Sequence, residues 1–456
     1  MPDKVFLVHG WSVDSTSTYQ ALHVKLAASG YQLHEVFLGR YVSLDDHVEV
    51  ADLARAMHKA LTNVLGKGSW KKERFHVVTH STGALVVRHW ISELYAGKRL
   101  EGKPLRNVVF LAGPQFGSRL AHHGRSMLAH IKWGGETGKR ILDGLELGSI
   151  YSWWLNGRWL IPANWKTKGV RPFCLIGDRV KASSMVRAVL PAAAEKGSDC
   201  VIRVPAGNLN FRRYEVDLVK KTSRRVGDIT GVPFGALADY THSGNEHGIM
   251  NSITEKATRQ NHQALRLLLE CLGVASKPDY DKVAATLAKA TRATRKKRGA
   301  YAQLDFRLRD VDGRPIEDYS IIIGYLDGGT VKPSKVVAHT HKNTVDPNHF
   351  TIFLETAKLE IERTFVLQLT ANTNTPLVDF NDDWNPVYSK DQITSLIIEN
   401  QTTQIDVILN RTPDPKLFVF HPGDSGQPGG SDPKGPTLHA KWDRKGDITK
   451  DGLGWE

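Results

Sequence analysis

The first 270 residues alternate short apolar, β-branched runs with segments of helical period, and this alternation restricts the fold more than any other feature. Apolar runs without a polar residue at every second position suit strands that are buried on both faces of a sheet. The pattern therefore predicts a mostly parallel sheet covered by helices. The expected strands are 5–8, 34–38, 75–78, 108–111, 173–176 and 200–204, and the expected helices are 18–28, 50–65, 84–95 and 260–272.

The pattern changes twice after this region. Residues 276–300 are rich in Ala, Lys and Arg and are interpreted as a basic helical linker. Beyond residue 300, β-forming runs are separated by turn residues such as Asp312-Gly313, which is typical of an antiparallel β sandwich. We therefore expect an α/β domain over 1–275, a linker over 276–300 and an all-β domain over 301–456.

The charge is divided in the same way as the fold. The chain of 456 residues carries 61 Lys and Arg against 48 Asp and Glu, a net charge of +13. Residues 1–300 hold 45 basic and 25 acidic residues, whereas residues 301–456 hold 16 and 23. A basic protein raises the hypothesis of nucleic-acid binding. Because the basic residues alternate with structured segments and form no RNA-binding motif, we expect no nucleic-acid partner.

Other classes of protein are excluded by simple counts. Three cysteines are too few for a disulfide scaffold. No apolar run approaches the roughly 18 residues of a membrane-spanning helix. The first residues lack the apolar stretch of a signal peptide, so we expect no classical secretory signal.

The strongest local signal is Phe75-His-Val-Val-Thr-His-Ser-Thr-Gly-Ala-Leu-Val-Val-Arg88. A buried strand leads into Ser81 and then into a helix, which is the context of the nucleophile elbow in α/β-hydrolases. Gly83 allows the helix to approach the strand closely, and the amide of Thr82 is a candidate oxyanion donor. Thr79 replaces the first glycine of the usual G-x-S-x-G pattern, so this motif alone also admits a structural serine.

A second oxyanion donor is expected in the loop after the first strand. That strand ends in His9-Gly10-Trp11, and hydrolases with this elbow use an amide at this place. The amide of Trp11 is the candidate, and an ordinary glycine turn is the alternative.

An activated serine needs a base and an orienting acid, which follow it in the chain order Ser, acid, His. Asp199, in a loop before the expected strand 200–204, is favoured as the acid over Asp178, which directly follows the strand 173–176. His247 is favoured as the base over His242, because Gly248 suits a sharp turn at the site.

With the motif Thr79-His-Ser-Thr-Gly83, the Asp199 and His247 segments and the β-rich tail together, the chain resembles the bacterial PlaB family of phospholipases A. The resemblance covers nearly the whole chain, and Thr-His-Ser-Thr-Gly is that family's own form of the motif. It implies a triad of Ser81, Asp199 and His247 with phospholipase A and lysophospholipase A activity. It further implies peripheral association with a membrane, and self-association to dimers or tetramers.

The resemblance also implies an NAD-type nucleotide as a ligand of the oligomer, although the chain has no G-x-G-x-x-G fingerprint. We expect no cofactor in catalysis and no metal site.

A tryptophan-rich insertion at about 130–170 is consistent with a lipid substrate. Trp153, Trp154 and Trp159 are candidates to face lipid from a cap or lid, since Trp favours the headgroup level of a membrane. The alternative is that these rings fill the core of a cap. The basic first domain suits anionic headgroups. The alternative functions are hydrolysis of another acyl ester, or a non-catalytic basic membrane-binding module on a hydrolase fold.

Overall fold

The computed structural model describes residues 3–9, 20–36, 45–66, 73–95, 103–121, 138–180, 194–417, 438–442 and 448–455. Tertiary contacts divide the chain into a large unit, residues 1–412, and a small unit, residues 413–456. In the described part of the small unit, a helical turn at Pro415–Leu417 precedes the antiparallel strands β19 (Leu438–Trp442) and β20 (Ile448–Trp455).

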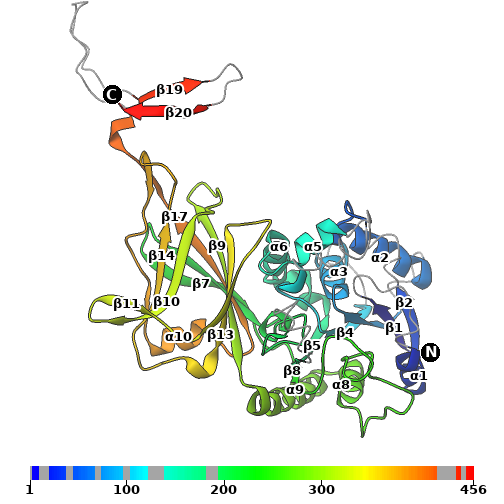
Figure 1. Cartoon of the computed structure of the whole chain (residues 1–456). Coiled ribbons are helices and arrows are strands. Elements are labelled where there is room, and N and C mark those ends of the chain that lie inside the picture. Colours follow the sequence, from blue (N-terminus) through cyan, green and yellow to red (C-terminus); the bar gives the residue numbers. More distant parts are fainter. Residues whose placement is uncertain are drawn as a thin grey trace, which may run out of the picture. The chain divides into compact units, whose positions relative to one another are not determined.

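The large unit contains a six-stranded parallel sheet with the order β2-β1-β3-β4-β5-β8 (Figure 1). All six residues of β3 are buried, including its polar members His76, Thr79 and His80, as expected of a strand covered on both faces of the sheet. The expected mostly parallel sheet of an α/β-hydrolase is confirmed. Its strands are β1 (Asp3–Val8), β2 (Tyr31–Val36), β3 (Phe75–His80), β4 (Leu105–Leu111), β5 (Arg171–Gly177) and β8 (Phe234–Leu237).

Helices cover both faces of this sheet. Successive strand residues point to opposite sides, and because both sets are apolar, each face needs its own cover. Val77 belongs to the core beneath α2, α3 and α6, whereas Val78 belongs to the core beneath α1, α8 and α9. The helices are α1 (Gln20–Ala28), α2 (Val50–Leu65), α3 (Gly83–His89), α5 (Lys139–Leu145), α6 (Ile150–Trp159), α8 (Gln263–Leu272) and α9 (Lys277–Arg298), and a π-helical turn at Trp90–Tyr95 extends α3.

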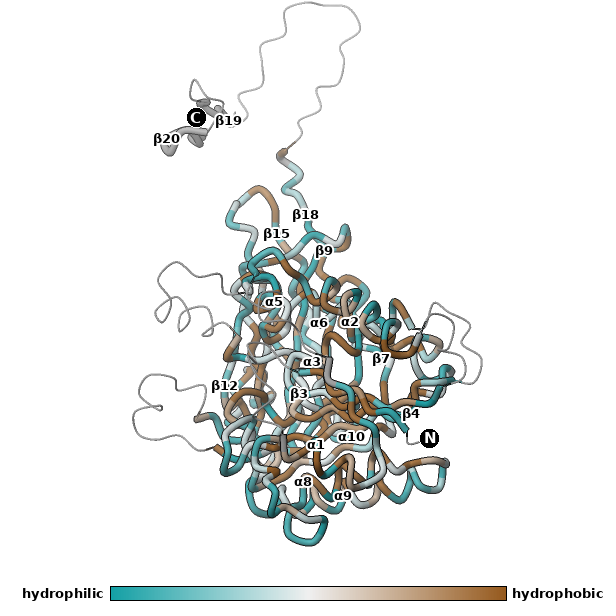
Figure 2. Tube along the Cα trace, turned by 90° about the vertical axis from the view of Figure 1, so that its right-hand side faces the viewer, coloured by the Kyte–Doolittle hydropathy of each residue, from teal (hydrophilic) through white to brown (hydrophobic). Residues whose placement is uncertain are grey.

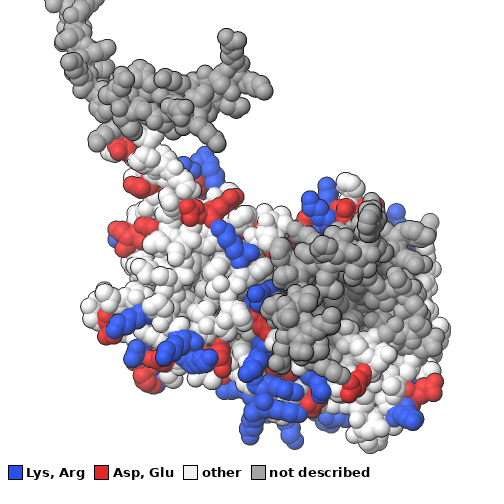
Figure 3. All heavy atoms as spheres, in the orientation of Figure 1, with Lys and Arg blue, Asp and Glu red and all other residues white. Residues whose placement is uncertain are grey.

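The basic segment expected as a linker is helix α9, which packs against the edge strand β8. The hydroxyl of Thr291 accepts a hydrogen bond from the Ala236 amide, and the hydroxyl of Thr294 donates one to the Ala236 carbonyl. Figure 3 shows Lys and Arg side chains gathered over the position of this helix. The segment therefore combines an inner face that completes the α/β core with an exposed basic face.

The β-rich part of the large unit consists of two facing sheets with a shared core, as the sequence predicts. One sheet has the order β12-β13-β9-β17-β6-β7 and the other β11-β10-β14-β16. Most pairings are antiparallel, but β17 runs parallel to both β9 and β6. The edge strand β12 is largely exposed and mainly hydrophilic (Figure 2).

The strands of the two sheets and the short elements around them have these bounds: β6 (Phe211–Asp217), β7 (Thr222–Ile229), β9 (Tyr301–Asp310), β10 (Tyr319–Asp327), β11 (Thr330–Pro333), β12 (Val337–Lys342), β13 (His349–Glu355), β14 (Phe365–Ala371), β16 (Val387–Tyr388) and β17 (Thr402–Leu409), with β15 (Val378–Phe380) paired to β18 (Arg411–Pro413), helix α10 (Lys390–Leu396), and 3-10 turns at Pro162–Asn164, Lys166–Lys168, Pro205–Gly207 and Thr356–Lys358.

The hairpin β6–β7 joins the two parts of the large unit. It lies within 1–275, yet its strands complete the sheet of the sandwich beside β17. The outer face of that sheet is polar but not solvated, since Gln303, Asp305 and Gln404 are fully buried. It packs on the α/β part, where the guanidinium of Arg213 donates a hydrogen bond to the carbonyl of Trp153. Alternation of polar and apolar residues in the sequence identifies such a strand, but it does not predict that another part of the protein covers the polar face.

Candidate active site

Ser81 lies on the sharp turn between β3 and α3, as the sequence predicts. Its φ angle is +54°, a left-handed conformation that is uncommon for a residue with a side chain. Such strain is a feature of nucleophile elbows, because it lifts the serine hydroxyl out of the backbone turn. The turn is fixed by the Ser81 amide, which donates to the Leu111 carbonyl at 3.1 Å.

Gly83 is required by the close approach of α3 to the end of β1. A Cβ atom added there lies 2.5 Å from the carbonyl oxygen of Val8 and 2.8 Å from that of His9. The helix therefore begins directly over the carboxyl ends of the strands. Thr82, at the start of α3, is buried, and its role as an oxyanion donor stays a prediction. Trp11, the other predicted donor, lies outside the described residues.

The imidazole beside Ser81 is that of His242, in the loop that follows β8. Its Nε2 lies 3.0 Å from the hydroxyl oxygen of Ser81, and its Nδ1 lies 3.0 Å from Oδ2 of Asp199. In this arrangement Nδ1–H donates to the carboxylate, and Nε2 accepts the serine proton. The three side chains form the relay that an activated serine needs.

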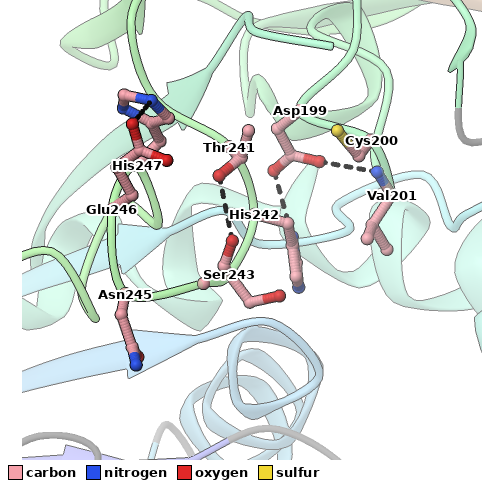
Figure 4. Close-up of a pocket in the computed structure, with 10 residues that line it drawn as sticks. Asp199, Cys200, Val201, Thr241, His242, Ser243, Asn245, Glu246 and His247 are labelled. Carbon is pink, nitrogen blue, oxygen red and sulfur yellow. Dashed lines mark hydrogen bonds and ion pairs between the residues drawn. The ribbon is translucent and has the colours of Figure 1, made fainter. Parts of the chain in front are cut away.

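His247, favoured from the sequence, does not belong to this relay. Its Nε2 lies 3.0 Å from Oε1 of Glu246. The reason is the closed shape of the loop, in which the Thr241 amide donates to the His247 carbonyl and the Ile249 amide returns to Thr241. These bonds hold His247 where the two ends of the loop come together. Figure 4 shows its ring beside Glu246, away from the imidazole of His242. The alternative base, His242, replaces it.

Asp199, favoured from the sequence as the acid, is the carboxylate beside this imidazole, but the chain around it is not the expected strand 200–204. It forms a tight loop in which Oδ1 accepts the amides of Val201 and Ile202, at 3.0 and 2.7 Å. Its carbonyl accepts the amide of His242 at 2.7 Å. Asp199 is fully buried, so backbone donors and the imidazole hold its carboxylate. Figure 4 shows Asp199, Val201 and His242 lining one pocket.

Asp178, the alternative acid, follows β5, but within the described part of the chain it forms no hydrogen bond or ion pair with His242. Its amide donates to the Leu237 carbonyl at 2.8 Å. Burial, together with the nearby Asp199, raises the pKa of this carboxyl to about 7, although Arg298 opposes the shift. Asp178 is therefore a buried carboxyl beside the relay.

His80 is a residue at the site to which sequence reasoning assigned no role. Its Nε2 lies 3.0 Å from the carbonyl oxygen of His242, and its ring centre is 4.9 Å from that of His242. Burial and the neighbouring His242 lower the pKa of His80 to about 3. A neutral His80 donates to that carbonyl and helps to fix the base. Its place directly before the serine was the only signal in the sequence.

The three candidate lipid-facing tryptophans differ in exposure. Trp153 and Trp159 are buried, and Trp154 alone is 40% exposed. Trp153 packs between the guanidinium groups of Arg213 and Arg307, each 5.1 Å from its ring centre. Trp159 stacks on another indole, that of Trp165. The expectation that Trp153 and Trp159 face lipid is therefore wrong, because α6 lies between the α/β core and the sandwich.

The described residues contain neither a membrane-spanning helix nor a cluster of metal ligands. Within the described ranges, no helix has the length and apolar character needed to cross a bilayer. Among the same residues, no group of three or more His, Cys, Asp or Glu side chains is arranged to hold a metal ion.

No protein-family model and no curated protein matches this sequence. Among solved structures, phospholipase PlaB from Legionella pneumophila has a TM-score of 0.79 and 27% sequence identity, covering 94% of this chain and 98% of that one. Its complex with thio-NAD gives the same TM-score and 28% identity, over 93% and 97% of the two chains. The mature lipase BlEst2 of Bacillus licheniformis covers 45% of this chain and 79% of its own, with a TM-score of 0.35 and 17% identity.

Proposed function

Because this chain belongs to the PlaB-like family of lipolytic α/β-hydrolases, we propose that it hydrolyses acyl esters of phospholipids and lysophospholipids. The observation that carries the proposal is the unbroken relay from Asp199 through His242 to Ser81, with 3.0 Å at each step. An esterase needs this combination of a strained serine, an imidazole within hydrogen-bond distance of its hydroxyl, and a buried carboxylate.

The mechanism follows from these atoms. Nε2 of His242 takes the proton of the Ser81 hydroxyl as the oxygen attacks the ester carbonyl. Asp199 stabilises the resulting imidazolium, and the protonated ring then gives its proton to the leaving alcohol. Water attacks the acyl-enzyme with the same base and releases the fatty acid. No cofactor enters these steps, and an NAD-type nucleotide is relevant at most to assembly.

Two observations support phospholipid as the substrate: the structural similarity to a phospholipase and the positive charge of residues 1–300. The Legionella protein with the same architecture along nearly the whole chain is described as a phospholipase. Residues 1–300 are strongly basic, and a basic surface favours anionic headgroups by about 1 kcal/mol per Lys or Arg near a membrane. Trp154 remains as the exposed aromatic candidate for the lipid interface. We extend the proposal to peripheral membrane association and to homo-oligomers, dimers or tetramers.

The test is fatty-acid release from defined phospholipids and lysophospholipids by the wild type and by Ser81→Ala. We expect the variant to lose about 10⁴-fold or more in turnover and all labelling by a fluorophosphonate. Ser243→Ala is the matched control, because Ser243 is an exposed serine of the same pocket that contributes its backbone carbonyl to Thr241.

Separate outcomes test the separate claims. Full activity of Ser81→Ala refutes the mechanism. Labelled protein that cleaves only soluble short-chain esters or triacylglycerols refutes the phospholipid assignment but keeps the esterase. Sedimentation with anionic vesicles, compared with zwitterionic ones, tests the membrane proposal, and equal binding to both contradicts the role of charge.

A further inference from the structure

The acid loop, residues 195–204, holds Asp199 in a conformation that is fastened at its base. Arg203 pairs with Glu195 through two hydrogen bonds of 2.8 and 2.9 Å, and both side chains are buried. The Val204 amide donates to the Gly197 carbonyl at 2.8 Å, closing the loop. The direction of the catalytic carboxylate therefore depends on the place of this base.

The surface on which the acid loop packs belongs to the sandwich. The guanidinium of Arg203 lies 4.4 Å from the ring centre of Phe353 in β13. Phe353 in turn stacks on Tyr301 of β9, with ring centres 5.1 Å apart and planes inclined by 7°. A Cβ atom on Gly197 lies only 2.3 Å from Cδ2 of Tyr301, so the loop backbone lies directly against that ring.

Further contacts between the loop region and the sandwich surround this aromatic pair. His339 of β12 lies 3.8 Å from Glu195. Just after the loop, the hydroxyl of Thr402 in β17 donates to the Pro205 carbonyl at 3.2 Å. The acid loop thus contacts three neighbouring strands, β12, β13 and β9, and the chain that leaves it is held by the fourth, β17.

We propose that Phe353 and Tyr301 are positioning residues, through which the sandwich holds the Asp199 carboxylate at the correct distance and direction for His242. The proposal rests on the proposed function, because it assigns the sandwich a role in the same reaction. It makes the sandwich part of the catalytic apparatus of each single chain, independent of assembly or membrane contact. Both rings contact the loop, through Arg203 and Gly197, and we assign their effect to the loop alone.

The physical reason is the sensitivity of the relay to position. The loop backbone supplies the two amides that orient Oδ1 of Asp199. A shift of the loop therefore changes the angle at Nδ1 of His242, and a displacement of about 1 Å costs up to about 100-fold in rate. The guanidinium of Arg203 lies over the ring of Phe353, which itself stacks on Tyr301, and this cation–π contact supports the loop. An aliphatic side chain at position 353 offers the cation no such ring face.

The experiment replaces one ring and compares it with a ring of the sandwich core. Phe353→Leu removes the support, whereas Phe365→Leu changes a buried Phe of β14 that packs on Tyr325 and Tyr388, away from the loop. Each change is made in the full chain and in an Asp199→Asn background. Hydrolysis of a soluble ester, the rate of fluorophosphonate labelling, the melting temperature and the oligomeric state are measured.

We expect Phe353→Leu to lower kcat by roughly 10- to 100-fold with KM little changed, while Phe365→Leu lowers the melting temperature similarly and keeps kcat. In the Asp199→Asn background, Phe353→Leu should cost nothing further, since the two residues act through one carboxylate. Multiplied losses in the double variant, or equal kcat losses for both phenylalanines, overturn the inference.

Two controls separate the possible failures. If Phe353→Leu does not fold, Tyr301→Leu repeats the test from the neighbouring strand. The proposed serine mechanism fails if Ser81→Ala stays active, and the phospholipid assignment fails if the labelled wild type cleaves no phospholipid. A wild type that labels at Ser81, with Phe353→Leu at full rate, overturns the positioning role alone.

Discussion

Replacing Asp199 by Asn tests the relay with the smallest change of shape. Oδ1 of Asp199 accepts two backbone amides, those of Val201 and Ile202, while Oδ2 faces Nδ1 of His242. An asparagine must keep its oxygen toward the two amides, because the reverse orientation sets its NH₂ against two N–H donors. Each donor left without an acceptor costs about 1–3 kcal/mol, so the orientation is fixed by roughly 2–6 kcal/mol.

The fixed orientation of the asparagine determines how much kcat falls. The asparagine NH₂ donates to Nδ1 of His242, so the imidazole proton moves to Nε2, 3.0 Å from the Ser81 hydroxyl. An Nε2–H cannot accept the serine proton. Trapping the wrong tautomer costs on the order of 10⁴-fold in kcat, or about 5.5 kcal/mol of barrier at 1.36 kcal/mol per factor of ten.

The assay is steady-state hydrolysis of a soluble ester at neutral pH, with fluorophosphonate labelling as an independent measure of serine activation. Asp178→Asn is the matched control, because Asp178 is a buried carboxyl near Asp199 whose side chain, among the described residues, is not hydrogen-bonded to the imidazole. We expect it to keep kcat within about tenfold. A loss of less than tenfold in Asp199→Asn, or equal losses in both variants, refutes the reasoning.

Two further predictions concern the choice of base and the buried interface. His242→Gln should lower kcat by about 10⁴-fold. His247→Gln, which removes the contact with Glu246, should keep most activity; the reverse order in an ester-hydrolysis assay contradicts the relay. Burial raises the pKa of Asp305 to about 7 from an ordinary value of 3.8. Between these two pH values the folded protein holds a proton that the unfolded chain has released. This contribution to stability is therefore lost as pH rises from about 4 through about 7. Asp305→Asn keeps an oxygen acceptor for the Thr351 hydroxyl, and its melting temperature relative to the wild type should therefore rise between pH 5 and pH 8; a constant difference contradicts the raised pKa.

The parallel sheet and the nucleophile could be predicted because their signals are local. The expected helix 50–65 coincides with α2, and the β3–Ser81–Gly83 turn follows from the motif. Strand 200–204 was wrong because its apolar residues pack in a loop closed by Arg203 and Glu195. β8 was missed because its sequence, Phe-Gly-Ala-Leu, contains no β-branched residue and therefore carries little strand signal.

By itself, the sequence determined the order of elements, the serine elbow and the presence of an acid and two histidines in the right chain order. Only the tertiary structure decided between those histidines. His242 and His247 are five residues apart in one loop, and their sequence contexts differ little. Backbone bonds across the loop turn one ring toward Asp199 and hold the other where the two ends of the loop come together. The support of Asp199 by Phe353 and Tyr301 joins strands about 100 to 150 residues further along the chain, and a contact over that separation has no local signature.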